Sequence, residues 1–159
     1  MVNDLAKMLT HRLVVITGGE PLLQRTELAK LLRYPGHIYQ FETNGTIAPK
    51  GLEKAHFVVS PKLKYFYDVD YKPEVIEAFN SLENVWWKFV VRNENDVKEV
   101  LSFLQRFNIS IDKVYLMPEG ATRESVRERQ TQVAELCLHF GLKYSPRLHI
   151  DLWGGKRGY

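Results

Sequence analysis

The segment from Thr17 to Pro21, with the sequence TGGEP, has the residue types and spacing needed to hold a ligand that carries a positively charged amino group. Two adjacent glycines, Gly18 and Gly19, have no Cβ atoms, so a ligand can approach the backbone closely. Backbone carbonyls at such a turn, together with the carboxylate of Glu20, can accept hydrogen bonds from an ammonium group. The alternative is an ordinary turn between a strand and a helix, in which the glycines only provide clearance.

An expected strand and an expected helix position this turn. Leu13–Ile16 is a continuous run of apolar, mostly β-branched residues, which predicts a strand buried on both faces of a parallel sheet. Pro21 suits the first turn of a helix, and the leucines after it recur at helical spacing, namely Leu28, Leu31 and Leu32. The order strand, glycine turn, helix is therefore expected.

Strands and helices are expected to alternate along the rest of the chain. Apolar or alternating patterns predict strands at 37–41, 56–59, 85–91 and 113–116, and a last strand in the segment 143–159. Helices are expected to begin at Asn3, at Pro73, near Val97 and after Thr122, which is expected to cap the last of them. This alternation indicates an α/β protein with a mostly parallel sheet, open or curled into part of a barrel.

Length and composition are those of an ordinary globular protein. With 159 residues, 45% of them hydrophobic and 26% charged, the chain is expected to form a single domain over residues 1–159. A formal net charge of +3 does not by itself indicate a nucleic-acid partner. No apolar run approaches the roughly 20 residues that span a bilayer, and the N-terminal residues lack the pattern of a signal peptide. We therefore expect a cytoplasmic protein with no membrane partner.

Polar residues follow four of the expected strands directly. They lie in the segments 17–20, 42–45, 60–62 and 117–119. Ligands of α/β proteins bind beyond the carboxyl ends of the strands, so we expect these four segments to lie at one site.

The segments TGGEP, ETNGT and SPK and the ending SPRLHIDLWGGKRG together closely resemble the 7-carboxy-7-deazaguanine synthase family of radical S-adenosylmethionine (SAM) enzymes, with TGGEP resembling their GGE motif. The resemblance runs from about Leu13 to the end of the chain. It implies a partial radical SAM barrel that binds SAM and acts on 6-carboxy-5,6,7,8-tetrahydropterin. The implied reaction is a radical ring contraction to 7-carboxy-7-deazaguanine with loss of ammonia, in queuosine or archaeosine biosynthesis. A homodimer and an external electron donor are also implied.

The same resemblance implies roles for residues at the strand ends. Ten residues would contact SAM: Gly18, Gly19, Glu20, Glu42, Ser60, Pro61, Lys62, Met117, Pro118 and Glu119. Plainer alternatives stay open for three of these places. Glu42 could cap its own Asn-Gly loop, Ser60 could belong to a simple Ser-Pro turn beside an exposed lysine, and Met117 could be a core residue.

Substrate contacts are implied for Thr17, His149 and the C-terminal residue Tyr159. Arg147 and His149 are two residues apart on the expected last strand and would therefore face the same side of it. The alternative for His149 is a purely structural role.

The sequence departs from the family in its cysteines. The family binds a 4Fe-4S cluster through a CxxxCxxC loop after its first strand, and iron–sulfur clusters need thiolate ligands. This sequence has a single cysteine, Cys137, which lies on the apolar stripe of an expected helix. The family also holds a Mg2+ ion near the cluster loop, so the ligand of that ion is absent as well. We therefore expect an N-terminally truncated member whose first strand and cluster loop are missing, and which does not perform radical chemistry as given. The alternatives are a non-catalytic module that binds SAM or a pterin, and an inert remnant.

A missing first strand would have a consequence for the strand Leu13–Ile16. Its outer edge would have lost a neighbour, and open edges of sheets tend to pair with other chains. We therefore expect this edge to be open to pairing.

Overall fold

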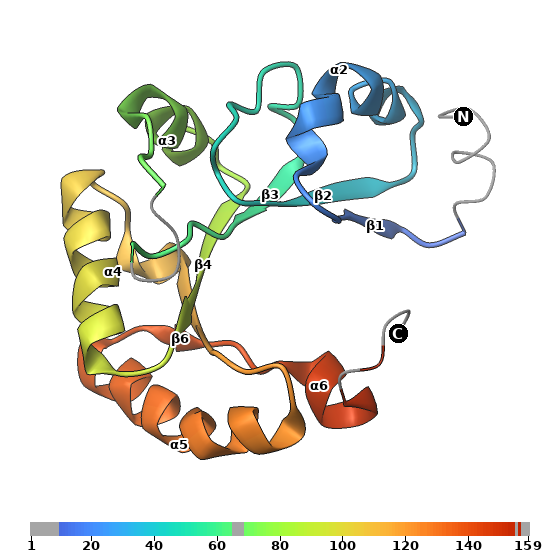
Figure 1. Ribbon diagram of the computed structural model, residues 1–159. Coiled ribbons are helices and arrows are strands. Elements are labelled where there is room, and N and C mark those ends of the chain that lie inside the picture. Colours follow the sequence, from blue (N-terminus) through green and yellow to red (C-terminus); the bar gives the residue numbers. More distant parts are fainter. Residues whose placement is uncertain (1–9, 65–68, 155, 157–159) are drawn as a thin grey trace. The chain divides into compact units, whose positions relative to one another are not determined.

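The computed structural model describes residues 10–64, 69–154 and 156 (Figure 1). The helix expected from Asn3 and the candidate residue Tyr159 lie outside these ranges. The chain divides into two compact units, which are described separately below. The first unit comprises residues 1–61 and 70–86, and the second comprises residues 62–69 and 87–159. A single domain over the whole chain stays a prediction.

The first unit contains three parallel strands, β1 (Leu13–Ile16), β2 (Ile38–Thr43) and β3 (His56–Val59), which lie side by side in this order. The 3-10 helix η1 (Pro21–Gln24), the helix α2 (Arg25–Leu28) and the 3-10 helix η2 (Leu31–Arg33) connect β1 to β2. Helix α3 (Pro73–Asn80) completes the unit. The helix expected after Pro21 is therefore present as three short pieces, which end before Pro35-Gly36.

Aromatic rings form the core of the first unit. Phe41 of β2 stacks on Phe57 of β3 with 5.6 Å between ring centroids, and Phe57 meets the edge of Phe79 of α3 at 5.3 Å. Side chains alternate between the two faces of a strand. Tyr39, Phe41 and Thr43 are accordingly buried, whereas Gln40 and Glu42 lie on the other face of β2.

The expectation that β1 is buried on both faces is wrong. Leu13 and Val15 are 51% and 48% exposed, and Val14 and Ile16 are only half-buried. Within the described ranges, β1 pairs with β2 alone. A continuous β-branched run favours strand conformation, but its burial depends on neighbours that the run itself does not specify. Pairing of its outer edge with another chain stays a prediction.

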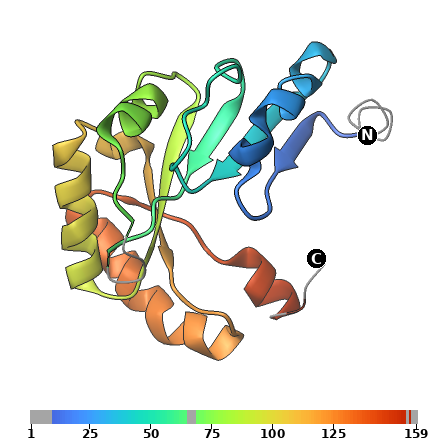
Figure 2. The ribbon, with the colours of Figure 1, turned by 45° about the horizontal axis from the view of Figure 1, so that its top comes forward.

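The second unit contains most of β4 (Val85–Val91), together with β5 (Val114–Pro118) and the two-residue strand β6 (Lys143–Tyr144). These three strands are also parallel and adjacent in this order. Helix α4 (Glu94–Arg106) and the 3-10 helix η3 (Ile111–Lys113) connect β4 to β5, and helix α5 (Arg123–Phe140) connects β5 to β6. Figure 2 shows α4 and α5 packed beside these strands. The α/β class with mostly parallel strands is confirmed.

The two long helices, α4 and α5, each begin after an N-cap residue whose side chain accepts backbone hydrogen bonds. Asn93 Oδ1 accepts hydrogen bonds from the backbone N–H groups of Asn95 (3.0 Å) and Asp96 (3.2 Å) at the start of α4. Thr122 caps α5, as expected, by accepting from the N–H of Ser125. Gly141 ends α5 with a φ of +68°, a conformation that glycine adopts readily.

The C-terminal segment is not the strand that its alternating pattern indicates. Among the residues of this segment that the structure describes, Lys143–Tyr144 alone form a strand, and α6 (Leu148–Trp153) follows it. Pro146 has no N–H group with which to continue the ladder of hydrogen bonds. The carbonyl of Arg147 instead accepts hydrogen bonds from the N–H groups of Ile150 (2.8 Å) and Asp151 (3.1 Å), which closes a helical turn. The argument that Arg147 and His149 share one face of a strand is therefore wrong.

Within the part of the chain that the structure describes, no helix combines the length and the apolar composition needed to cross a membrane.

Candidate functional site

The glycine turn after β1 is open to a ligand. Thr17, Gly18 and Gly19 are exposed, and a Cβ atom added to either glycine would have no other atom within 4 Å. Gly18 has a φ of +142°, which disfavours other residue types. Glu20 follows in an extended conformation and is the N-cap of η1, with Pro21 at the first helical position. The turn therefore presents bare backbone beside a carboxylate.

The carboxylate of Glu20 joins this turn to the end of β2. Its Oε1 accepts hydrogen bonds from the N–H of Leu22 (2.9 Å) and from the hydroxyl of Thr43 (2.8 Å), and its Oε2 accepts from the N–H of Asn44 (2.8 Å). An ionised carboxylate has about four acceptor positions. Three donors hold Glu20 in one orientation and leave acceptor capacity for a ligand.

Thr43 is the centre of this arrangement, and sequence reasoning did not single it out. It is 3% exposed, and its Oγ1 both donates to Glu20 and accepts from the N–H of Gly45 at 3.2 Å. Its carbonyl accepts from the N–H of Ser60 at 2.7 Å. One residue thus links the ends of β1, β2 and β3, which carry the candidates Glu20 and Ser60. The sequence signal that could have indicated Thr43 is its position as a polar residue at the end of an alternating strand, on the face of the apolar residues Tyr39 and Phe41.

Glu42 is the second-last residue of β2, shortly before the Asn-Gly loop. It lies within β2, on the face opposite Thr43. The N–H groups of Asn44 and Gly45 donate to Glu20 and Thr43, and that of Thr46 donates to Asn44 Oδ1 at 2.9 Å. These three N–H groups therefore have acceptors other than Glu42, and the capping alternative for Glu42 stays a prediction.

Gly45 is required in this loop for two reasons. Its backbone φ of +77° is one that residues other than glycine rarely adopt. An added Cβ would also come within 2.8 Å of Val59 Cγ1 in the core of the unit.

Positive charges gather around Lys62 in the second unit. Burial lowers the pKa of Lys62, and the nearby charges of Lys88 and Arg147 lower it further. Arg147 Nε is buried and has no hydrogen-bond partner within the described ranges. Lys88 and Arg147 were not expected here, although Lys88 is the one charged residue of the apolar strand VWWKFVV. Such a cluster suits an anionic group, for example a carboxylate.

Met117 lies on a half-buried face of β5. In the register of the parallel strands, Lys88 pairs with Tyr115, and Val90 pairs with Met117. These four side chains therefore point to the same side of the sheet, whereas Leu116 lies in the core on the other side.

Pro118 and Glu119 follow Met117 at the carboxyl end of β5. Pro118 is the buried last residue of the strand. The N–H of Glu119 donates to the carbonyl of Val91 at 2.9 Å. Arg129 Nη1 lies 3.6 Å from Glu119 Oε2.

His149 is an exposed residue of α6. Arg123 of α5 holds this helix by donating to the carbonyl oxygens of Ile150 (3.3 Å), Asp151 (3.0 Å) and Leu152 (2.7 Å). These hydrogen bonds from α5 thus help to position the helix that carries His149. That His149 and the other candidates of the second unit belong to one site with those of the first unit stays a prediction.

The described residues do not fit an iron–sulfur cluster. Among them, no three His, Cys, Asp or Glu side chains gather in a way that could hold a metal ion. Cys137 is a buried core residue of α5, as expected, and its Sγ lies 3.6 Å from the carbonyl oxygen of Lys143. Burial raises the pKa of the Cys137 thiol, which favours the protonated form over the thiolate that a cluster needs.

Comparison with solved structures defines the class of fold. The chain aligns with QueE from Escherichia coli at a TM-score of 0.68 and 24% identity, over 92% of this chain and 63% of that one. It aligns with SuiB from Streptococcus suis, solved bound to SAM, at a TM-score of 0.58 and 14% identity, over 92% of this chain and 42% of that one. The chain therefore shares the α/β fold of these two proteins.

Sequence relatives define the family within that class, although no protein-family model matches the chain. The 7-carboxy-7-deazaguanine synthase of Hyperthermus butylicus is 37% identical over 167 residues, which cover 94% of this chain and 68% of that protein. The enzyme of the same name from Pyrobaculum aerophilum is 37% identical over 152 residues, which cover 91% and 67%. The chain belongs to the 7-carboxy-7-deazaguanine synthase family. It spans about two thirds of the length of these relatives.

Proposed function

We propose that this chain is the SAM- and substrate-binding portion of a 7-carboxy-7-deazaguanine synthase. The observation that carries the proposal is the network in which Thr43 links Glu20 to Ser60 at the ends of three parallel strands. Ligands of parallel sheets bind beyond such ends. A network that fixes an acidic side chain beside bare glycine backbone suits the amino group of the methionine part of SAM.

Each proposed contact follows from the chemistry of the residue. In the first unit, the backbone of Gly18 and Gly19, the free acceptor position of Glu20 and the hydroxyl of Ser60 can bind polar groups of SAM. Further SAM contacts are proposed for Glu42 and Pro61 in the first unit, and for Lys62, Met117, Pro118 and Glu119 in the second. The ammonium group of Lys62 suits the SAM carboxylate.

Contacts with the substrate 6-carboxy-5,6,7,8-tetrahydropterin are proposed for Thr17, His149 and Tyr159. The cationic cluster of Lys62, Lys88 and Arg147 suits anionic groups, and both SAM and this substrate carry a carboxylate. The product of the reaction would be 7-carboxy-7-deazaguanine.

We further propose that the chain as given binds SAM without cleaving it. In the family, the reduced 4Fe-4S cluster supplies the electron that cleaves SAM, and that cluster needs three thiolates from a CxxxCxxC loop. This sequence has one cysteine in total. The residues here supply positioning and charge stabilisation. Binding of Mg2+, a homodimer and an external electron donor belong to the same proposal for the complete enzyme.

Calorimetric titration of the purified chain with SAM tests the proposal, together with the variant Lys62→Met. We expect one SAM to bind per wild-type chain, and Lys62→Met to bind about tenfold more weakly, because one charge-assisted hydrogen bond is lost. The variant should still unfold in one cooperative urea transition, since the half-buried Lys62 is replaced by an apolar side chain of similar length.

Lys98→Met is the matched control for this titration. Lys98 forms an exposed ion pair with Glu94 on α4 at 2.9 Å, so its loss should leave SAM affinity unchanged. If SAM does not bind to the wild-type chain, or if both variants weaken binding equally, the proposed role is wrong. Release of 5′-deoxyadenosine by the purified chain under reducing, anaerobic conditions would contradict the proposal that it does not cleave SAM.

A further inference from the structure

Among the described residues, the hydroxyl proton of Thr43 has one recipient. The N–H of Gly45 donates to Thr43 Oγ1 at 3.2 Å, so the hydroxyl is an acceptor in that contact. Glu20 Oε1 lies 2.8 Å from the same oxygen, and an ionised carboxylate can only accept. The proton of Thr43 is therefore donated to Glu20. Thr43 is 3% exposed, and a buried hydrogen bond is stronger than the same bond in water.

This hydrogen bond determines which oxygen of Glu20 has an acceptor position left for a ligand. An ionised carboxylate has about two acceptor positions on each oxygen. Both positions of Oε1 are used, one by the N–H of Leu22 at 2.9 Å and one by Thr43. Within the described ranges, Oε2 accepts from the N–H of Asn44 alone, at 2.8 Å. The remaining acceptor position is therefore on Oε2.

Thr43 is the residue whose type matters in this arrangement. Leu22 and Asn44 donate from their backbones, which any residue except proline could do at these positions. Thr43 instead donates from its side chain, and a valine of the same shape could not. A hydrogen bond to an ionised carboxylate is roughly twice as strong as one between neutral groups. The orientation of Glu20 therefore depends on a hydroxyl at position 43.

We propose that Thr43 is a positioning residue for ligand recognition, whose hydroxyl fixes the carboxylate of Glu20 so that Oε2 accepts a hydrogen bond from the ammonium group of an amino acid moiety. This inference rests on the proposed function, in which that moiety is the methionine part of SAM. An acceptor that is already fixed loses no freedom when the ligand binds, which increases affinity. A ligand without an amino group gains nothing from this hydroxyl.

Calorimetric titration of Thr43→Val with SAM and with 5′-methylthioadenosine, which lacks the amino acid moiety, tests this role. Valine keeps the shape of threonine and suits a strand. We expect SAM to bind about tenfold more weakly to Thr43→Val than to the wild type, because the carboxylate is no longer held. Methylthioadenosine should bind equally to both. Thr43→Ser restores the hydroxyl and should restore SAM affinity.

Thr46→Val is the matched control from the same loop. The hydroxyl of Thr46 donates to Asn44 Oδ1 at 2.6 Å and not to Glu20, and its N–H keeps a hydrogen bond to the same Oδ1 at 2.9 Å. The substitution should leave SAM affinity unchanged. The proposal is overturned if Thr43→Val and Thr46→Val weaken SAM binding equally, if Thr43→Val weakens both ligands equally, or if Thr43→Ser binds SAM as weakly as Thr43→Val.

A second pair of variants decides the question if Thr43→Val does not fold. Thr43→Ser and Thr43→Cys have nearly the same shape, but a thiol is a weak hydrogen-bond donor. SAM should therefore bind more weakly to Thr43→Cys than to Thr43→Ser. Equal binding by these two variants would overturn the proposal.

Amide hydrogen exchange tests the positioning step without a ligand. Without the Thr43 hydroxyl, the carboxylate of Glu20 is free to leave the N–H groups of Leu22 and Asn44. These two amides should then exchange about tenfold faster in Thr43→Val than in the wild type. A wild-type chain that does not bind SAM would overturn the proposed function, whereas unchanged exchange at these two amides would overturn the positioning role of Thr43.

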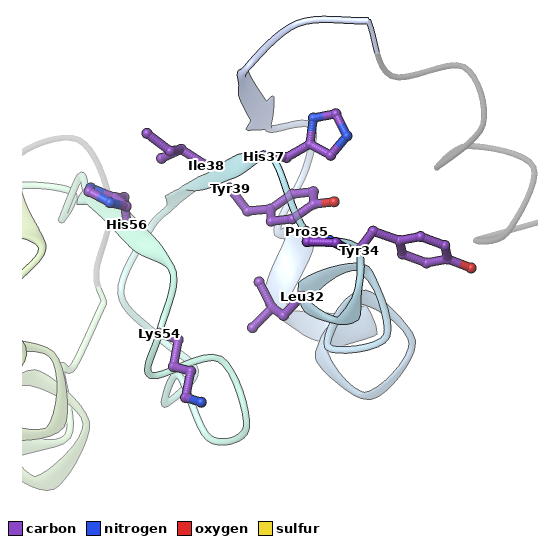
Figure 3. A pocket seen from close by; sticks show the side chains of 8 residues that line it. All are labelled: Leu32, Tyr34, Pro35, His37, Ile38, Tyr39, Lys54 and His56. Carbon is purple, nitrogen blue, oxygen red and sulfur yellow. The ribbon is translucent and has the colours of Figure 1, made fainter.

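Two amides away from the strand ends serve as references for this exchange experiment. The N–H of Phe57 donates to the carbonyl oxygen of Asn84 at 2.9 Å, and the N–H of Ile38 donates to that of Arg12 at 2.6 Å. Figure 3 shows Ile38 at the start of β2, beside a pocket of about 230 Å³ whose lining includes no residue of the proposed SAM site. Both reference amides should accelerate less than the amides that donate to Glu20, and equal acceleration would overturn the proposal.

Discussion

Replacing Glu20 with alanine is expected to lower the free energy of unfolding by about 2 kcal/mol and to abolish SAM binding. The carboxylate accepts hydrogen bonds from Leu22, Thr43 and Asn44. Removing it leaves three donors without an acceptor, one of them on the buried Thr43. Leaving buried donors unsatisfied costs about 1–3 kcal/mol. Urea unfolding and SAM calorimetry measure the two effects.

The control for this variant is Glu27→Ala. Glu27 pairs with Lys30 at 2.6 Å on an exposed surface, and such pairs contribute about 0–1 kcal/mol. Its removal should therefore change unfolding little and leave SAM affinity unchanged. If Glu20→Ala is as stable as Glu27→Ala and still binds SAM, the carboxylate neither holds the strand ends together nor contributes to the site.

Replacing Asp96 with alanine is expected to lower the free energy of unfolding by about 3 kcal/mol. Asp96 is 4% exposed and accepts three hydrogen bonds from Arg92, from its N–H (2.9 Å), Nε (2.8 Å) and Nη2 (2.8 Å). Removing one partner of a buried ion pair costs about 3–5 kcal/mol. Glu94→Ala, which breaks the exposed pair with Lys98, should cost far less in the same urea experiment.

Asp96 also predicts how stability depends on pH. Burial alone would raise the pKa of Asp96, but the hydrogen bonds and charge of Arg92 outweigh it, so the pKa lies below its ordinary value. A carboxyl whose pKa is lowered by folding stabilises the protein fully above its unfolded pKa of about 3.9, and this contribution is lost as the pH falls through the folded pKa. The difference between wild type and Asp96→Ala should therefore shrink below about pH 4. A difference that stays constant down to pH 2 would contradict this account.

Local signals predicted much of the fold. The strand β4 depends on a run of β-branched and aromatic residues, and the cap of α5 depends on the hydroxyl of Thr122. Both signals act within a few residues. The C-terminal segment could not be predicted in this way, because the alternation of Leu148, Ile150 and Leu152 resembles a strand. Pro146 and the hydrogen bonds from Arg123 to the carbonyls of α6 favour the helix instead.

The candidate site was predictable only in part. The glycines and carboxylate of the turn at 17–20 indicate a ligand by their types alone. The role of Thr43 depends on the register of three strands, which no local pattern specifies. The cationic neighbours of Lys62 come from β4 and from the N-cap of α6, far away in the sequence, so that cluster also required the structure.

Titration of the 15N-labelled chain with SAM, followed by nuclear magnetic resonance, tests the central claim most directly. The account predicts saturable shifts at the backbone N–H groups of Gly18, Gly19, Glu20, Asn44 and Ser60. Lys54 and His56, which lie before and at the start of β3, at the other end of the strand from Ser60, should not shift. Saturable shifts confined to residues other than those strand ends, or no shifts at all, would contradict it.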